Sequence, residues 1–234
     1  EQSASYASHH ATALRSYLRY RATCGDQVSK LVAVITSPVH WRLATLPKAL
    51  SAEDAGRLLD AAAVAPKTPK RAYAIVRLAL DLGLRSGEIA NLNLADIDWQ
   101  AGTLTLCGTK SQRQDVVPLP YQTGKSLADY IEHERPAIRH PAVFVRQVAG
   151  RTTPITSLAV QKVIKRSCRR IGLPDVSAHA LRHTVACRLV ERGSSLKEVA
   201  DLLRHRSLNS TLIYAKLDTP KLAAVALPWP GSTA

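Results

Sequence analysis

The chain has 234 residues, which is enough for one sizeable domain or for one domain and a small second one. A chain of this length, with 46% apolar residues, can bury a core and does not need disulfides for stability. Its apolar residues form no uncharged run of about 18, which argues against a membrane span. Lysine and arginine number 32 against 18 acidic residues, and the net charge of +14 favours a polyanionic partner, most often nucleic acid, over an anionic lipid surface.

The first part of the chain predicts one helix without a core. Apolar residues recur at helical spacing over residues 9–21, with arginines on the opposite side. A loosely patterned stretch follows, to about Pro47. Because this segment is too short to bury a core, we interpret it as the end of a preceding domain plus a linker. The chain starts in mid-pattern and without Met, so we expect it to be a piece of a longer protein.

A regular helical pattern begins after this stretch. Ser51 opens a capping sequence, and the helix behind it ends at Pro66. Residues 70–82 are apolar on most of their circumference, which predicts a buried helix that stops at Gly83. Arg85 follows this stop directly and opens a further short helix.

The sequence period then changes to two, which indicates strands. Residues 103–107 and 114–119 predict a small antiparallel hairpin with Lys110 near its turn. Further elements are predicted in this order: helices over 121–135, 156–171, 179–192, 196–203, 207–217 and 219–227, and a short strand over 142–145. The fold class that follows is mostly α with a small antiparallel β-hairpin or sheet, an α+β fold.

The helix predicted over 156–171 is strongly basic. Its cations lie on or near one face, and they are Lys162, Lys165, Arg166, Arg169 and Arg170. We expect this face to contact nucleic acid.

Four reactive polar side chains lie in the last third of the sequence: His179, Arg182, His205 and Tyr214. Arg85 and Lys110, earlier in the chain, complete the set. Taken one at a time, each has an ordinary explanation, such as a packed aromatic ring, a turn lysine or a solvated helix face. Taken together, they fit a phosphodiester substrate. Two arginines can hold its non-bridging oxygens, and a phenol with a pKa of about 10 attacks only a target activated in this way.

In order and spacing, this set resembles the tyrosine recombinase, or phage integrase, family over about residues 48–227. The matching stretches are residues 83–89 with the first arginine, 108–110 with the hairpin lysine, 179–184 with the His-x-x-Arg box, 203–207 with the second histidine, and 211–214 with the tyrosine. The family has a glycine directly before the second histidine, where this chain has Arg204. Arg113 and Lys125 lie near Lys110 and are alternatives for the hairpin lysine.

The resemblance implies a covalent mechanism. Tyr214 attacks the scissile phosphate in line, forms a 3′-phosphotyrosyl ester and releases a 5′-hydroxyl. His179 takes the proton of the tyrosine, or helps to take it, and Lys110 protonates the leaving 5′ oxygen. Attack by the 5′-hydroxyl of a partner strand then reverses the chemistry on a new DNA end.

The resemblance also implies how the charge of the transition state is met. Arg85 and Arg182 hold the non-bridging oxygens, His205 donates a hydrogen bond to the phosphate, and Glu88 orients Arg85. No cofactor is expected, neither a metal ion nor ATP, because the cations supply the charge and the phosphotyrosine stores the bond energy. The four cysteines are scattered without a Cys-x-x-Cys pair, which predicts reduced thiols in a cytosolic protein.

The partners and domains implied by the resemblance are those of a DNA-assembled enzyme. We expect double-stranded DNA carrying a recombination site, a homotetramer on that DNA, and a cytoplasmic, nucleoid-associated location of bacterial or phage type. Residues 1–47 would be the remnant of an N-terminal helical core-binding domain plus a linker, and residues 48–234 the catalytic domain. The apolar helix predicted near the C-terminus either docks on a neighbouring subunit or folds back on its own domain.

Three alternatives stay open at this point. A type IB topoisomerase shares the chemistry but yields relaxed circles instead of recombinants. A non-catalytic DNA-binding protein is disfavoured because all the reactive positions are intact. A phosphatase or RNA-processing enzyme would act on a small phosphate ester. The sequence does not identify the DNA site, nor whether the parent is a phage integrase, a transposon recombinase or a dimer resolvase.

Overall fold

The computed structural model describes residues 4–36, 49–107, 114–148, 151–173, 176–204 and 211–217. The chain divides into two compact units, Glu1–Thr45 and Leu46–Ala234. Lys110, His205 and the helix predicted over 219–227 lie outside the described residues. No helix of the described part has both the length and the apolar character needed to cross a membrane.

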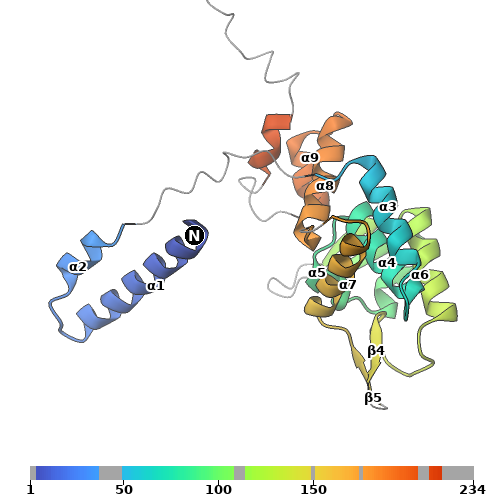
Figure 1. The fold of residues 1–234 in the computed structure, drawn as a ribbon, viewed down its shortest axis with the longest axis horizontal. Helices are drawn as coiled ribbons and strands as arrows, with labels where there is room; N and C mark the ends of the chain where they lie inside the picture. Colours follow the sequence, from blue (N-terminus) through green and yellow to red (C-terminus); the bar gives the residue numbers. More distant parts are fainter. Residues whose placement is uncertain are drawn as a thin grey trace, which may run out of the picture. The chain divides into compact units, whose positions relative to one another are not determined.

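Within residues 4–36, the described part of the first unit, the chain forms two helices, α1 (Ala4–Thr23) and α2 (Ser29–Val34) (Figure 1). Arg15 Nη2 donates a hydrogen bond to the Ile35 carbonyl at 2.8 Å and so ties the end of α2 to α1. Of the described side chains of this unit, only that of Ala11 is buried. The helix predicted for this region is confirmed as part of the longer α1, and its described side chains form almost no apolar core.

The second unit is mostly helical with two small antiparallel sheets. Its α-helices are α3 (Ala52–Ala63), α4 (Pro69–Asp81), α5 (Ser86–Ala90), α6 (Tyr121–His133), α7 (Ser157–Arg170), α8 (Ala178–Glu191) and α9 (Leu196–Leu202). Its strands are β1 (Ile97–Asp98), β2 (Thr103–Cys107), β3 (Gln114–Pro118), β4 (Val145–Val148) and β5 (Arg151–Pro154), and its short 3₁₀ helices are η1 (Leu94–Asp96) and η3 (Leu212–Leu217). The predicted fold class is confirmed.

Helix α4 lies at the centre of this unit. It contacts α3, α6, α7 and α8, and its buried side chains, Ile75 and Leu78 among them, belong to the main core. Figure 1 shows these helices packed together, with the β4–β5 hairpin at one end of the unit and α8 and α9 at the other. The near-continuous apolar surface of α4 predicted this central position.

The helix boundaries follow the capping signals of the sequence. Ser51 Oγ caps α3, and Ser195 and Glu198 form the predicted capping box at the start of α9. Helix α4 ends just before Gly83, whose φ of +59° is unfavourable for a residue with a side chain. A Cβ at this position would also lie 2.8 Å from Leu203 Cδ2, so the close approach of the α9 end to the α4 end requires glycine.

The two sheets were predicted less completely. The β2–β3 hairpin is confirmed, and β1 adds a third strand too short to have a periodic signal. The strand predicted over 142–145 is wrong in position: β4 begins at Val145 and pairs with β5, which was not predicted because it lacks an apolar alternation. Ala142 instead forms an isolated bridge with Asn93.

A second, smaller hydrophobic cluster lies beside the main core. We call it the tyrosine cluster, and its buried members are Val185, Ala186, Cys187, Val190, Val199, Leu203 and Tyr214. The helix predicted over 207–217 is confirmed in the residues described there, but it is not an α-helix. Residues 212–217 form a 3₁₀ helix, and the Tyr214 amide donates to the Thr211 carbonyl at 2.9 Å, the i to i+3 spacing of that helix type.

Candidate active site

A cavity of about 590 Å³ lies between α5, α7 and the first turns of α8. Its described lining includes Arg85 before α5, Gln161 and Lys165 on α7, and His179 and Arg182 on α8. No acidic side chain is among the described residues that line it. The cavity therefore presents positive charge to whatever enters it, which suits an anionic group.

Arg182 is the most deeply placed of these cations. Its side chain is 2% exposed, and its Nη1 donates to the Gly83 carbonyl at 2.7 Å while Nη2 donates to the Leu203 carbonyl. Burial lowers the pKa of Arg182 to about 9, and the nearby charge of Arg85 acts in the same direction. The guanidinium is still charged at neutral pH, so the fold fixes a positive charge at the cavity wall.

Arg85 is held by Glu88 at the start of α5. The Arg85 amide donates to Glu88 Oε2 at 2.8 Å, and Arg85 Nη1 pairs with Glu88 Oε1 at 2.7 Å. The Arg85 side chain is 46% exposed. Burial alone would raise the pKa of the Glu88 carboxyl, but the charge of Arg204 and the hydrogen bonds from Arg85 bring it below its ordinary value. Glu88 is therefore a carboxylate at neutral pH.

Arg204 completes this charge group and was not predicted as a site residue. Its side chain is 7% exposed, and its Nη2 pairs with Glu88 Oε2 at 2.8 Å. Its Nη1 donates to the Leu202 carbonyl at 3.0 Å, and its own carbonyl accepts from Arg85 Nη2 at 3.4 Å. The only signal in the sequence was that an arginine stands where the resembling family has glycine.

Two histidines follow each other on one face of α8. The rings of His179 and His183 meet edge to face with centroids 4.6 Å apart, and His179 faces the cavity. Burial lowers the pKa of His179, and the charges of Arg182 and Arg85 lower it further. Burial also lowers the pKa of His183, followed by the effects of His179 and Arg182. Both imidazoles are therefore neutral at pH 7 and can accept protons.

Tyr214 lies in the tyrosine cluster and is not among the described residues that line the cavity. Its side chain is 1% exposed, and its hydroxyl oxygen lies 2.5 Å from His183 Nδ1 in a hydrogen bond. Burial raises the pKa of Tyr214 to about 12, Cys187 adds to this, and Arg182 opposes it. The phenol is thus neutral and is held by His183, a residue that the sequence analysis did not single out although it lies one turn after His179.

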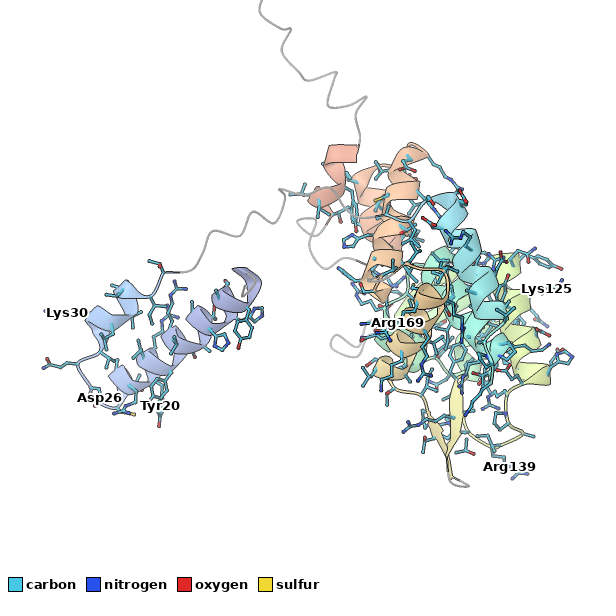
Figure 2. All side chains as sticks on the ribbon, viewed as in Figure 1. Tyr20, Asp26, Lys30, Lys125, Arg139 and Arg169 are labelled. Carbon is cyan, nitrogen blue, oxygen red and sulfur yellow. The ribbon has the colours of Figure 1, made fainter. Side chains whose placement is uncertain are left out.

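The basic helix α7 forms one side of the cavity. All five predicted cations on it are exposed: Lys162, Lys165, Arg166, Arg169 and Arg170. Lys165 lines the cavity itself, and Arg170 Nη1 donates to the Ala61 carbonyl at 3.0 Å and is thereby held against α3. Arg169, which directly precedes Arg170 in the sequence, is labelled on this helix in Figure 2.

The other predicted site residues are placed as follows. Lys110, its neighbour Arg113 and His205 lie outside the described residues. Lys125 is exposed on α6, at the edge of the unit in Figure 2, and is not among the described residues that line the cavity. In the described ranges no group of three or more His, Cys, Asp or Glu side chains is arranged to hold a metal ion.

Comparison with known sequences gives consistent relatives. A sequence model of the phage integrase family matches residues 48–220. A putative integrase/recombinase of Sinorhizobium fredii, y4rA, is 36% identical over 222 residues, which cover 94% of this chain and 54% of that protein. The tyrosine recombinase XerA of Thermococcus kodakarensis is 32% identical over 210 residues, which cover 90% of this chain and 70% of the XerA chain. The chain spans about half the length of y4rA and of y4rF, a second Sinorhizobium relative.

Comparison with solved structures places the fold among the same proteins. The crystal structure of XerA recombinase superimposes with a TM-score of 0.66 at 21% identity, covering 94% of this chain and 84% of that one. The post-cleavage complex of XerH site-specific recombinase with a palindromic difH substrate gives a TM-score of 0.65 at 26% identity, covering 77% of this chain and 52% of that one.

Proposed function

The chain belongs to the phage integrase family, and on that premise we propose that it is the catalytic part of a site-specific tyrosine recombinase. The proposed activity is cutting and rejoining of double-stranded DNA through a 3′-phosphotyrosine intermediate. The observation that carries the proposal is the gathering of Arg85, His179 and Arg182 at one cavity, with Tyr214 hydrogen-bonded to His183, whose ring contacts that of His179.

The cavity cations are proposed to bind the scissile phosphate. Arg182 uses two of its five N–H groups on backbone carbonyls and keeps the others for a ligand. Arg85 is half exposed beside it. Two guanidinium groups fixed before the reaction can stabilise the additional charge of a pentacoordinate phosphate without reorganising. No metal ion or ATP takes part in this proposal.

Tyr214 is proposed as the nucleophile. Its oxygen attacks phosphorus in line, a bond forms between the phenolic oxygen and phosphorus, and the bond to the 5′ oxygen breaks. Because the hydroxyl is buried and paired with His183, Tyr214 has to enter the cavity first. His179, which is neutral and faces the cavity, then accepts the phenolic proton.

The remaining roles are proposed from the sequence. Lys110 gives a proton to the leaving 5′ oxygen, and His205 donates a hydrogen bond to the phosphate. Rejoining runs the same steps in reverse, with the 5′-hydroxyl of a partner strand as the attacking group. Proton and bond counts then balance over the cycle, and no external energy source is required.

Double-stranded DNA with a recombination site is the proposed partner. Of the exposed cations of α7, Lys165 lines the cavity, and the others lie on the same helix, where they can contact phosphates beside the cut. DNA-bound relatives such as XerH support this assignment. We further propose a homotetramer on two duplexes, with residues 1–47 as part of a core-binding domain, residues 48–234 as the catalytic domain, and a cytoplasmic location next to the nucleoid. The C-terminal helix predicted from the sequence is proposed as the docking piece, on a neighbouring subunit or on its own domain.

The alternatives are less well supported. The relatives named are recombinases and integrases, which disfavours a type IB topoisomerase and a phosphatase. A non-catalytic DNA-binding protein would have no need for a buried tyrosine hydrogen-bonded to a histidine whose ring contacts that of His179 at a cationic cavity.

The test is covalent capture of DNA. The protein is incubated with a library of nicked duplexes of randomised sequence, in which the released fragment diffuses away and traps the intermediate. We expect protein–DNA adducts that survive denaturation, form in excess chelator and yield one enriched sequence. Tyr214→Phe should abolish them, because the attacking oxygen is gone.

A matched control is Tyr130→Phe. Tyr130 is buried to the same degree as Tyr214 but lies in the main core, so its hydroxyl can be removed without touching the site. This variant should form adducts at the wild-type rate. Adducts that persist in Tyr214→Phe would show that another residue is the nucleophile. Specific DNA binding without any adduct from the wild-type protein would identify a binding protein instead of an enzyme.

A further inference from the structure

Arg204 occupies a backbone conformation that normally belongs to glycine. Its φ is +54°, and every other described residue with positive φ is a glycine. A residue with a Cβ is disfavoured there because the Cβ crowds the following carbonyl oxygen. A large side chain at such a position therefore has to make contacts that compensate for the backbone conformation.

Apart from the hydrogen bond of Nη1 to the Leu202 carbonyl, those contacts lead to Arg85. Arg204 Nη2 pairs with Glu88 Oε2 at 2.8 Å, and Glu88 Oε1 pairs with Arg85 Nη1 at 2.7 Å. The Arg204 carbonyl in turn accepts from Arg85 Nη2 at 3.4 Å. The three residues form a closed ring in which one carboxylate lies between two guanidinium groups.

Removing Arg204 would change what Arg85 can offer to an anion. A carboxylate left alone with an arginine tends to take it in a bidentate pair, with both oxygens on the same guanidinium. In the ring, Arg204 and the Arg85 amide hold Oε2, so the Arg85 side chain pairs only with Oε1. One further donor, Nη2, reaches the Arg204 carbonyl at 3.4 Å, and the remaining N–H groups of Arg85 stay available to a ligand.

The charge balance has the same consequence. Arg85 and Glu88 by themselves form a neutral pair at the wall of the cavity, and Arg204 brings the ring to a charge of +1. Arg204 itself is 7% exposed and is not among the described residues that line the cavity, so it acts on a bound phosphate through its neighbours.

We infer that Arg204 is a positioning residue: it holds Glu88 so that Arg85 presents free donors and net positive charge to the scissile phosphate. This inference rests on the proposed function. Arg204 also stands directly before His205, so its ring ties the chain just before the second histidine to the first arginine.

The test uses Arg204→Gly, because glycine suits the positive φ and the backbone is expected to keep its course. On the duplex recovered by covalent capture, we expect adduct formation at saturating DNA to slow by about 10- to 100-fold. DNA affinity should change less than about threefold and the melting temperature should not fall. Arg204→Lys keeps the charge without the fork and should recover part of the rate.

Non-additivity separates positioning from a general structural effect. If Arg204 acts through Arg85, then the double variant Arg204→Gly, Arg85→Ala should be no slower than Arg85→Ala alone. The ¹³C resonance of the Glu88 carboxyl gives a readout independent of activity, since its pKa should rise in Arg204→Gly when the neighbouring charge is removed.

The outcomes are distinguishable. A wild-type rate in Arg204→Gly, or losses that multiply in the double variant, would overturn the positioning role and leave the proposed function intact. A wild-type protein that forms no adduct on any duplex would overturn the proposed function and the positioning role with it.

Discussion

The cavity and the tyrosine cluster lie side by side but hold their reactive groups in opposite states. At the cavity, Arg85 and Arg182 are charged and already fixed by a carboxylate and by backbone carbonyls. In the tyrosine cluster, Tyr214 is neutral, 1% exposed and paired with His183. On the proposed function, the part of the site that binds phosphate is therefore organised before DNA binds, whereas the proposed nucleophile lies outside the cavity.

This difference has a physical reason in each region. Fixed charges lower the barrier most when they need not reorganise, so the fold orders them in advance. A phenol that is exposed in the cavity before DNA binds has no catalytic advantage. Burial keeps the Tyr214 hydroxyl protonated, because it raises the pKa of this group. If the proposed function holds, the resting structure can bind phosphate, and the first chemical step requires a rearrangement of the residues around Tyr214.

The largest effect is expected from the substitution of Arg182 at the cavity. Arg182→Ala should slow adduct formation by about 10²- to 10³-fold, as for the loss of a fixed transition-state donor. It should also reduce the free energy of unfolding by about 2 to 4 kcal/mol, because two carbonyls lose their donor. Quenched adduct assays and urea denaturation measure the two effects.

Arg188→Ala is the control for Arg182→Ala. It removes the same side chain from the same helix, but Arg188 lies outside the cavity lining. Equal losses in both variants would mean that the cavity has no special role for its buried arginine.

For the tyrosine cluster, we predict a loss of stability at alkaline pH. The pKa of Tyr214 is raised to about 12 in the folded protein, while an unfolded tyrosine titrates near about 10. Because the folded value is the higher one, this stabilisation is complete below about pH 10 and is lost as the pH rises through about 12. Between these values the free energy of unfolding should fall by up to about 2 to 3 kcal/mol more in wild type than in Tyr214→Phe.

Denaturation of both proteins by urea at a series of pH values from 9 upwards checks this difference. The subtraction removes the titration of lysines and other tyrosines, which the two proteins share. Parallel curves would mean that the Tyr214 hydroxyl reaches solvent in the resting protein, and the contrast between the two regions would be lost.

The smallest effect is expected on DNA binding when single cations of α7 are removed. Lys162→Ala should weaken DNA binding a few-fold and reduce the slope of log affinity against log salt by about 1, as for one lost phosphate contact. Arg170→Ala should change the slope less, because its guanidinium is held on the Ala61 carbonyl. Fluorescence anisotropy on the captured duplex at several salt concentrations measures both, and a reversed order would place the DNA on another face of α7.

The helical part of the fold could be predicted because its signals are local. Ser51, Ser195 and Glu198 mark helix starts by capping, and Gly83 marks a stop by its positive φ. The β4–β5 hairpin was missed because its strands lack an alternating pattern, so its pairing follows from the turn and the neighbouring chain instead of from a periodic sequence signal.

The candidate site divides in the same way. Arg85, His179 and Arg182 could be found because short motifs carry them. The contact of Tyr214 with His183 and the ring around Arg204 depend on chain segments that meet only in the folded unit. A sequence shows that Arg204 departs from a family pattern, but only the contact with Glu88 gives that departure a physical meaning.

The hydrogen bonds of Arg182 to two backbone carbonyls make one side chain important for both the stability and the proposed activity of the chain. One guanidinium holds the carbonyls at the ends of two helices and also lines the cavity, so a substitution of Arg182 should lower the stability of the fold and, on the proposed function, the activity together. Tyr214→Phe, in contrast, keeps the surrounding cluster filled and loses only the hydrogen bond to His183. It therefore removes the proposed attacking oxygen at a smaller cost in stability, and it is the variant of choice for trapping an uncut DNA complex.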